Sequence, residues 1–424
     1  MRLLVATNWD PNLIEPLSKL RTVDQIFGVL PTTAVGSGRP GSSLPKMTPE
    51  QAENYIKLAH SKGIEFDYLL NASCMGNMEW DENTHRELLN QLDWISSIGT
   101  DSVTITIPYL VELVKKQFPQ LKVRVSTIAH VNSVARAKFF ESMGADSITL
   151  DFNINRDFKL LQTIRNAVKC ELNLLLNDAC LYQCPFRYYH YNSISHSTQP
   201  YNPLKGFYVE YHTIRCTIER YSDPSQFIKS RWIRPEDTSI YEELGINSFK
   251  VSGRAMSTEW ILNAAQAYSS RQYKGNLCDI LQVFNTATRY SNPSSPLSRV
   301  MEMGPKLARH KDLLRATQAS ADLSPHLKLL ENESFLSLLQ AQPPETFIDN
   351  QALEGFLDFF KKQDCLSGCS YCNYCQKIAD KAVKIDRNET DKYISVLKKF
   401  TDDLTSSRIF KFNPGEWKEG SYNE

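Results

Sequence analysis

Residues 180–196 hold the side chains of this sequence that are best suited to chemistry. Cys180 and Cys184 directly follow an apolar run at 172–176 that is typical of a buried strand. Because α/β proteins place their reactive groups where strands end, thiols at this point predict a metal site rather than core packing. Arg187 and His190 lie just behind them. We expect these two side chains either to bind an anionic substrate or move protons, or to stabilise the loop through hydrogen bonds.

Two further cysteines are expected on the same face. Cys74 follows the third expected strand, and Cys216 lies in the long connection after the seventh. The C-terminal ends of all strands in a barrel of parallel strands lie on one face, so Cys74, Cys180, Cys184 and Cys216 are expected to converge. Four thiolates bind a [4Fe–4S] cluster or a structural zinc ion. At a face where chemistry is expected we favour the [4Fe–4S] cluster, with unrelated buried thiols as the alternative.

Two isolated cysteines are expected to pack in the core. Cys170 precedes the seventh strand, and about seven residues at ~3.3 Å each carry the chain roughly 23 Å to the opposite end of the barrel. It therefore cannot easily join the other thiols. Cys278 stands alone near an expected helix.

A second group of cysteines lies near the C-terminus. Cys365, Cys369, Cys372 and Cys375 form the pattern C-x₃-C-x₂-C-x₂-C. Core packing gives no reason to place four thiols within eleven residues, so the pattern predicts a metal site. Zinc and a second [4Fe–4S] cluster both fit this ligand set.

Two basic residues lie on and just after the last expected strand, in Ser-Phe-Lys-Val-Ser-Gly-Arg. Lys250 alternates with apolar neighbours, so its side chain should point into the barrel. A buried charge is costly unless it is paired, which favours a functional role for Lys250 and Arg254. Asp151 ends the sixth expected strand and His130 follows the fifth; each either faces the site or caps a helix.

Strands and helices alternate through the first 270 residues. Strands are expected at 2–6, 25–30, 66–71, 102–107, 122–127, 147–152, 171–177 and 248–252, and helices at 49–62, 82–98, 109–117, 131–143, 156–168 and 258–269. Glycines such as Gly63 and Gly99 end several helices. Eight strands alternating with helices predict a (β/α)₈ TIM-like barrel of the α/β class. A doubly wound open sheet is the alternative, although no Gly-x-Gly-x-x-Gly follows the first strand.

The connection between the seventh and eighth strands is unusually long. About 70 residues separate positions 177 and 248, and loops of that length are usually functional. A helix start is expected at 232–237. After the barrel, the sequence predicts a mostly helical C-terminal region, which divides the chain into domains at 1–275 and 276–424.

Bulk properties narrow the class of protein. The chain has 424 residues with 48 basic and 48 acidic side chains, and this balance argues against a surface that coats nucleic acid broadly. No run of 18 apolar residues is present, so we expect no membrane partner. The N-terminal segment lacks the features of a signal peptide, which predicts a cytoplasmic protein.

The stretch at 234–254, Arg-Pro-Glu-Asp-Thr-Ser-Ile-Tyr-Glu-Glu-Leu-Gly-Ile-Asn-Ser-Phe-Lys-Val-Ser-Gly-Arg, resembles the closing segment of the collagenase-like U-32 peptidase family. In that family a Lys-Asp-Leu helix leads into Gly-(Ile/Val)-x-Ser-(Phe/Leu)-Lys-Ile-Glu-Gly-Arg. The region around Cys180 is similar to the cysteine-bearing segment after the family's seventh strand. The resemblance covers roughly residues 1–275 and is specific in the last part of that range.

The resemblance implies a TIM-like barrel with a four-cysteine [4Fe–4S] site and an oxygen-independent hydroxylase, with a prephenate-like anion as co-substrate and an organic, RNA or peptide substrate. A peptidase and a non-catalytic iron–sulfur electron-transfer or scaffold partner of another protein are the alternatives. Three departures indicate a divergent branch: Ser252 replaces the family's Glu, Cys180 and Cys184 are closer together than usual, and the C-terminal cysteines lie outside the common core.

Overall fold

The computed structural model describes residues 1–31, 33–41, 44–45, 47–203, 209, 211–283, 329, 332–362, 365 and 371–410. Eight parallel strands form a closed barrel in which each strand pairs with the next and the last pairs with the first. The strands are β1 (Arg2–Ala6), β2 (Val23–Gly28), β3 (Glu65–Leu70), β4 (Ser102–Ile105), β5 (Lys122–Val125), β6 (Ser147–Thr149), β7 (Glu171–Leu175) and β8 (Ser248–Val251). The predicted TIM-like barrel is therefore confirmed.

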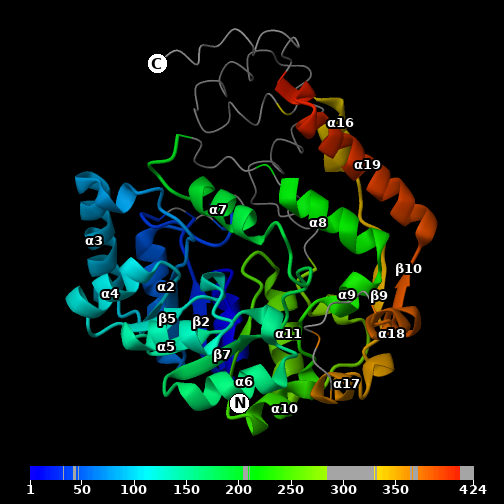
Figure 1. The fold of residues 1–424 in the computed structure, drawn as a ribbon. Coiled ribbons are helices and arrows are strands. Elements are labelled where there is room, and N and C mark those ends of the chain that lie inside the picture. Colours follow the sequence, from blue (N-terminus) through cyan, green and yellow to red (C-terminus); the bar gives the residue numbers. More distant parts are fainter. Residues whose placement is uncertain are drawn as a thin grey trace.

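Helices surround the barrel in the expected alternation (Figure 1). They are α1 (Ile14–Ser18), α2 (Pro49–Ser61), α3 (Glu82–Ser97), α4 (Pro108–Gln117), α5 (Val134–Ser142), α6 (Phe158–Ala167), α10 (Thr238–Glu243) and α11 (Thr258–Ser270). Local sequence explains where they begin: Thr48 and Gln51 form a capping box at α2, and Asp81 caps α3. Gly63 and Gly99 follow α2 and α3 with φ of 75° and 81°, which a glycine adopts without strain.

The barrel interior is polar, unlike the branched aliphatic core that is common in this fold. Fully buried Asp67 on β3 accepts hydrogen bonds from Ser102 (3.1 Å) and Thr104 (2.5 Å) on β4. Arg124 on β5 lies 3.8 Å from Asp67 and donates to Gln25 on β2 at 2.9 Å. This network, which we call the interior network, links four neighbouring strands below the face where the strands end.

The long connection before β8 is mostly helical. It contains α7 (Arg187–Ser197), α8 (Tyr211–Ser222), α9 (Ser225–Lys229) and the short turn η6 (Pro235–Asp237) ahead of α10. The helix start expected at 232–237 corresponds to η6 and α10. Figure 1 shows α7 and α8 lying across the upper end of the barrel. Cys180 and Cys184 precede α7, and Cys216 lies on α8.

The C-terminal region packs beside α8 and α9 (Figure 1). Its described elements are η7 (Leu277–Asp279), α16 (Glu333–Gln340), β9 (Thr346–Ile348), η8 (Gln351–Leu353), α17 (Asp358–Lys362), α18 (Tyr374–Ala382), β10 (Val383–Ile385), α19 (Arg387–Thr405) and η10 (Arg408–Phe410). Helix α19 packs on α8, and α18 packs on α9. Buried residues of this region, such as Phe356 and Leu397, belong to the same hydrophobic cluster as the barrel.

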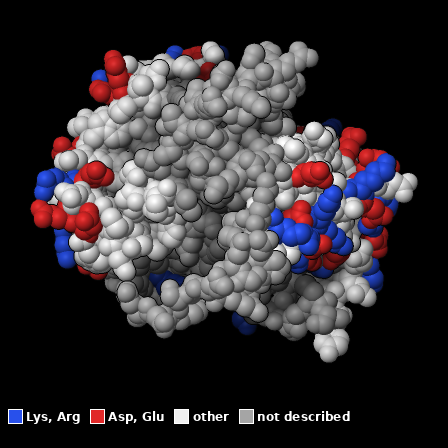
Figure 2. All heavy atoms as spheres, turned by 90° about the horizontal axis from the view of Figure 1, so that it is seen from above, with Lys and Arg blue, Asp and Glu red and all other residues white. Residues whose placement is uncertain are grey.

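The surface matches a chain of balanced charge. Seen from above in Figure 2, acidic and basic side chains of the described residues gather toward the periphery, and those near the centre of this face are mostly uncharged. Among the described helices, none is both long enough and apolar enough to cross a membrane.

Candidate functional site

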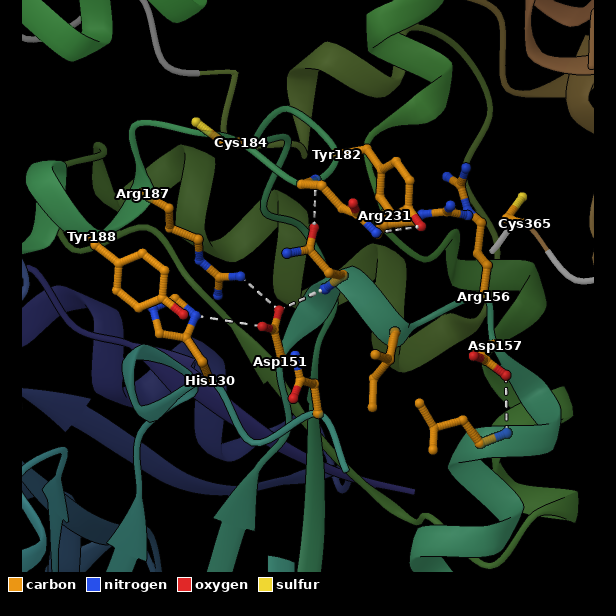
Figure 3. A pocket seen from close by; sticks show the side chains of 15 residues that line it. His130, Asp151, Arg156, Asp157, Tyr182, Cys184, Arg187, Tyr188, Arg231 and Cys365 are labelled. Atoms are coloured by element: carbon orange, nitrogen blue, oxygen red, sulfur yellow. Dashed lines mark hydrogen bonds and ion pairs between the residues drawn. The ribbon is translucent and has the colours of Figure 1, made fainter. Parts of the chain in front are cut away.

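Two cavities lie on either side of the cysteine-bearing segment. We call the first the barrel mouth; it lies where the strands end and is lined by Cys180, His190, Lys250 and Arg254 among others. The second, the outer cavity, is lined by Cys184, Arg187, His130, Arg156 and Arg231 among others (Figure 3). The sequence predicted one site at this face, and the structure divides its residues between two.

Lys250 points into the barrel, as its alternation with apolar neighbours predicted. Its Nζ lies 3.4 Å from Asp67 Oδ2 and 4.0 Å from the centre of the Phe27 ring. Burial lowers the pKa of Lys250 to about 8, with Asp67 opposing the shift and the charges of Arg124 and Arg254 adding to it. Lys250 can therefore exchange a proton near neutral pH, and it carries a positive charge to the floor of the barrel mouth.

Arg254 adds a second buried positive charge to the barrel mouth. Burial lowers the pKa of its guanidinium, and the nearby charge of Arg39 lowers it further. Arg254 Nη1 and Thr149 Oγ1 are both buried and have no hydrogen-bond partner among the described residues. Unsatisfied buried donors around a small cavity of about 80 Å³ indicate a place for the charged group of an anion.

A glycine-rich loop at residues 35–41 forms one wall of this mouth, which Gly38 and Arg39 line. The N–H of Gly38 donates to Asn71 Oδ1 at 3.0 Å, and Arg39 donates to Gln282 Oε1 at 2.5 Å. A side chain at position 38 would meet Ile128 Cδ1 at 2.5 Å. The glycine thus allows the loop to approach the barrel closely.

Three of the four expected thiols lie near one another. Burial raises the pKa of Cys180 well above the usual thiol value, and ionised Cys184 and Cys216 would raise it further. Burial raises the pKa of Cys216 to about 11, against the lowering effect of Arg220, while Cys184 adds to the rise. Half-buried thiols that repel one another's negative charge suit a site where a soft metal centre takes up that charge. Their sulfur atoms are the donors that iron–sulfur clusters use.

Cys74 has different neighbours. Its Sγ accepts a hydrogen bond from the N–H of Gly76 at 3.1 Å, and its carbonyl accepts one from Gln199 at 2.7 Å. Burial raises the pKa of Tyr201, and the charges of Glu79 and of ionised Cys74 would raise it further. Cys74 as the fourth ligand stays a prediction. Among the residues that the structure describes, no group of three or more His, Cys, Asp or Glu side chains has the geometry to hold a metal ion.

His190 lies in the barrel mouth, one helical turn past Arg187. Its ring stacks on His212 of α8 with 4.2 Å between ring centres and lies 5.7 Å from the ring of Tyr191. Burial lowers the pKa of His212 to about 3, so that ring is neutral at neutral pH. The stack packs α7 against α8, which carries Cys216. His190 is positioned either to move protons or to hold this packing.

Arg187 faces the outer cavity rather than the mouth. Its Nη1 donates to Asp151 Oδ1 at 2.7 Å, and His130 Nδ1 lies 3.4 Å from Asp151 Oδ2 (Figure 3). Burial alone would raise the pKa of Asp151, but the hydrogen bond from His130 and the charge of Arg187 outweigh it and lower the pKa to about 2. Asp151 also accepts from Asn153 N at 2.9 Å, so it caps η5 (Phe152–Ile154) as well as facing the cavity.

One of the C-terminal cysteines reaches the outer cavity. Cys365 lines the cavity, and Cys375 is half-buried at the start of α18. Cys372 is exposed, and Cys369 lies outside the described residues. The metal site predicted for these four cysteines stays a prediction. Cys170 and Cys278, expected to pack, are half-buried against the hydrophobic cluster.

Sequence reasoning missed several residues of the interior network and of the outer cavity. Asp67 and Arg124 are charged residues within strands, and their alternation with apolar neighbours carries the same signal that identified Lys250. Arg156 and Arg231 are also buried, but they lie between regular elements, where the sequence offers no periodicity to indicate it.

Comparison with known proteins gives several matches. The model of peptidase family U32 matches residues 42–274. An uncharacterized protease of Methanocaldococcus jannaschii, MJ1657, is 32% identical over 355 residues, which are 83% of this chain and 86% of that protein. The tRNA hydroxylation protein P of Escherichia coli is 24% identical over 175 residues, which are 40% of this chain and 36% of that protein. A solved structure, the U32 peptidase Mk0906, is 24% identical with a TM-score of 0.44 over 60% of this chain and 94% of that one.

The family match and the relative from Methanocaldococcus jannaschii cover most of the barrel, including Cys74, Cys180, Cys184, Cys216 and Lys250. The family model alone spans more than half of the chain. The chain therefore belongs to peptidase family U32.

Proposed function

We propose that this protein is an iron–sulfur enzyme that hydroxylates or similarly modifies an organic substrate, with RNA as the favoured class, without molecular oxygen. The observation that carries the proposal is the position of three half-buried cysteines: Cys180 lines the cation-lined barrel mouth, and Cys184 and Cys216 are close enough to affect its ionisation. The similarity to the tRNA hydroxylation protein P of Escherichia coli supports an RNA substrate, although it covers only 40% of this chain.

In this proposal Cys180, Cys184 and Cys216 hold a [4Fe–4S] cluster, with Cys74 as the fourth candidate. A bound cluster would supply one-electron redox chemistry at the mouth. The protein's own contribution is to bring these half-buried thiols together from the segment before α7 and from α8, where the surrounding side chains would partly shield a cluster from water.

Lys250 and Arg254 would bind the carboxylate of a small anionic co-substrate of the prephenate-like kind. Asp67 holds the Lys250 ammonium from below, so that its remaining N–H groups can be directed toward the mouth. Arg254 Nη1 offers a donor that no described residue uses. Charge-assisted hydrogen bonds from two cations in a buried cavity would orient the anion against the thiol-bearing wall.

An RNA substrate fits the rim of the site. Tyr188 and Tyr189 on α7 are 64% and 57% exposed; Tyr188 lines the outer cavity, and Tyr189 lies against His212 of α8. Exposed aromatic rings beside a cationic cavity are a stacking surface for unpaired bases. Because the chain has no net charge, this local arrangement rather than a basic coat would provide the contact with RNA.

The C-terminal cysteines would hold a second metal centre, either a [4Fe–4S] cluster that relays electrons or a zinc ion that stabilises this region. The packing of α18 on α9 would place such a centre beside the barrel. A Cys375→Ser variant should lose the metal of the C-terminal cysteines and keep that of the barrel, so metal analysis of the variant distinguishes the two centres.

The reaction is tested by nucleoside mass spectrometry of RNA from cells that lack the chain, complemented with wild-type protein or with Lys250→Met. We expect a nucleoside that is heavier by one oxygen only with the wild type. Identical nucleoside profiles in all three strains would exclude an RNA hydroxylase.

A peptidase is the second candidate, because Cys184, His130 and Asp151 line one cavity. A thiol, an imidazole and a carboxylate are the groups that cysteine peptidases use. Two observations weigh against it. Burial raises the pKa of Cys184, which disfavours the reactive thiolate, and Arg187 shares the carboxylate of Asp151. Cleavage of unfolded protein by wild type but not by Cys184→Ser, under anaerobic conditions, would favour the peptidase.

A further inference from the structure

Two buried arginines, Arg156 and Arg231, form one wall of the outer cavity (Figure 3). They are only 3% and 4% exposed. Arg156 donates to the carbonyls of Ile228 at 2.6 Å and Trp232 at 3.3 Å. Within the described part of the chain, the guanidinium of Arg231 makes no hydrogen bond or ion pair, and the buried Nε of each arginine has no partner.

The surroundings of these arginines are aromatic rather than acidic. The guanidinium of Arg231 lies 3.9 Å from the centre of the Tyr182 ring, and that of Arg156 lies 4.6 Å from the Phe356 ring and 4.9 Å from the Trp232 ring. Cation–π contacts offset part of the cost of burial, but they carry no negative charge. Burial lowers the pKa of Arg156, and the charge of Arg231 lowers it further.

The carboxylates of the outer cavity are already engaged. Asp151 is bound by Arg187 and His130, and Asp157 caps α6 by accepting from Leu160 N at 2.9 Å. Two buried positive charges thus face a cavity in which the two acidic side chains of the described lining, Asp151 and Asp157, have other partners. A buried charge without a counter-charge is costly, so an anion from outside the described residues is the missing partner.

We propose that the outer cavity binds a small molecule through its phosphate or carboxylate group, held between Arg156 and Arg231. The cavity has a volume of about 330 Å³, within the range of small-molecule sites. Planar guanidiniums bind both oxyanions in bidentate fashion. Gln183 lines the same cavity. One N–H of its Nε2 donates to Tyr182 Oη at 3.1 Å, and its second N–H can donate to the rest of the ligand. The site is separate from the barrel mouth and does not depend on the proposed function.

The C-terminal thiols offer a competing explanation. Cys365 lines the same cavity, and ionised Cys375 and Cys365 would both favour the charged form of Arg156. If these cysteines bound a metal as thiolates, as the proposed second metal centre requires, their negative charge would offset part of the positive charge of the arginines. The experiment must therefore separate a free anion from bound thiolates.

The test is calorimetric titration of the full chain with inorganic phosphate and, separately, with malonate as a dicarboxylate probe. It is done in a Lys250→Met background, which removes a cation from the barrel mouth, so that the remaining binding reports on the outer cavity. We expect saturable binding of one probe, which distinguishes phosphate from carboxylate ligands. Arg231→Met should weaken it at least tenfold, about the effect of one lost charge-assisted contact.

Arg86→Met is the matched control, because it removes an exposed arginine on α3 that pairs only within its helix, and it should bind like the background. Arg231→Lys covers the case in which the methionine variant does not fold, and it should bind with intermediate affinity. If neither phosphate nor malonate binds, or if binding is equal with and without Arg231, the proposal is overturned. Loss of metal from the C-terminal cysteines in Arg231→Met, without any anion binding, would assign the counter-charge to the thiolates.

Discussion

The barrel mouth and the outer cavity both hold buried cations, but they balance them differently. At the floor of the mouth and below it, Lys250 and Arg124 share the carboxylate of Asp67 on strand β3. In the outer cavity, Arg187 has Asp151, whereas Arg156 and Arg231 have aromatic faces and backbone carbonyls. Lys250 and Arg124 have a carboxylate partner within the barrel, so their burial does not require a bound anion. Charges without a carboxylate partner indicate recognition of an anion.

The largest expected effect is on the interior network. Asp67→Asn keeps the volume of the side chain but leaves Lys250 and Arg124 without their shared carboxylate. Breaking a buried ion pair costs about 3–5 kcal/mol, so we expect the free energy of unfolding to fall by that amount in urea at pH 7.

Asp24→Asn is the control for this variant, because Asp24 is half-exposed and pairs with Arg2 at 3.6 Å on the surface. It should cost less than about 1 kcal/mol. Equal losses in the two variants would mean that the barrel does not depend on an internal charge balance.

The second effect concerns the balanced part of the outer cavity and depends on pH. The pKa of Asp151 is about 2 in the folded protein and about 3.9 in the unfolded chain. A lowered pKa contributes stability that is fully present above the unfolded value and is lost as the pH falls toward the folded one. Asp151→Asn should therefore cost about 2–3 kcal/mol at pH 6, and the gap from wild type should narrow between pH 4 and pH 3. Urea unfolding at a series of pH values measures it; a gap that is independent of pH would contradict the ion-pair account.

The third effect distinguishes the cation of the mouth from the arginines outside it. Lys250 loses its proton as the pH rises through about 8. In an Arg231→Met background, malonate affinity should fall about tenfold between pH 7 and pH 9, since a group can change affinity at most tenfold per pH unit above its pKa. Lys250→Met in the same background should give weak binding that does not vary with pH. If the malonate affinity of Arg231→Met with Lys250 intact does not change between pH 7 and pH 9, Lys250 does not bind the anion.

The smallest effect is expected at the rim between the cavities. Tyr188→Ala should weaken binding of single-stranded RNA by about 1 kcal/mol, the lower end of the value of one stacked base. Phe139→Ala on α5 removes another exposed ring far from the rim and should leave affinity unchanged. Fluorescence anisotropy with a short labelled RNA measures both, and equal affinities would argue against a stacking role for Tyr188.

The barrel was predictable because its signals are local. Apolar runs marked all eight strands within a few residues, and caps such as Thr48 and Gly63 marked helix ends. The strands proved shorter at their C-terminal ends than expected; β6, for example, ends at Thr149 rather than at 152. The residues after each strand turn away into loops and short helices that carry the site, so apolar character there reflects burial rather than strand.

The division of the site into two cavities was not predictable. Placing Arg187 and His190 at one site followed from their nearness in sequence, but they have different partners, Asp151 for Arg187 and His212 for His190, and they line different cavities. Arg156 and Arg231 became neighbours only through tertiary packing of the long connection on the barrel. Spacing along a chain identifies which residues reach a face, whereas helix orientation decides which cavity each one lines.

The central claim, that Cys180, Cys184 and Cys216 bind a [4Fe–4S] cluster, is tested most directly by iron and acid-labile sulfide analysis of anaerobically purified protein. The account predicts that Cys216→Ser loses about four irons and four sulfides relative to the wild type, while Cys170→Ser at the other end of the barrel retains them. Wild-type protein without iron, or equal iron in the two variants, would contradict it.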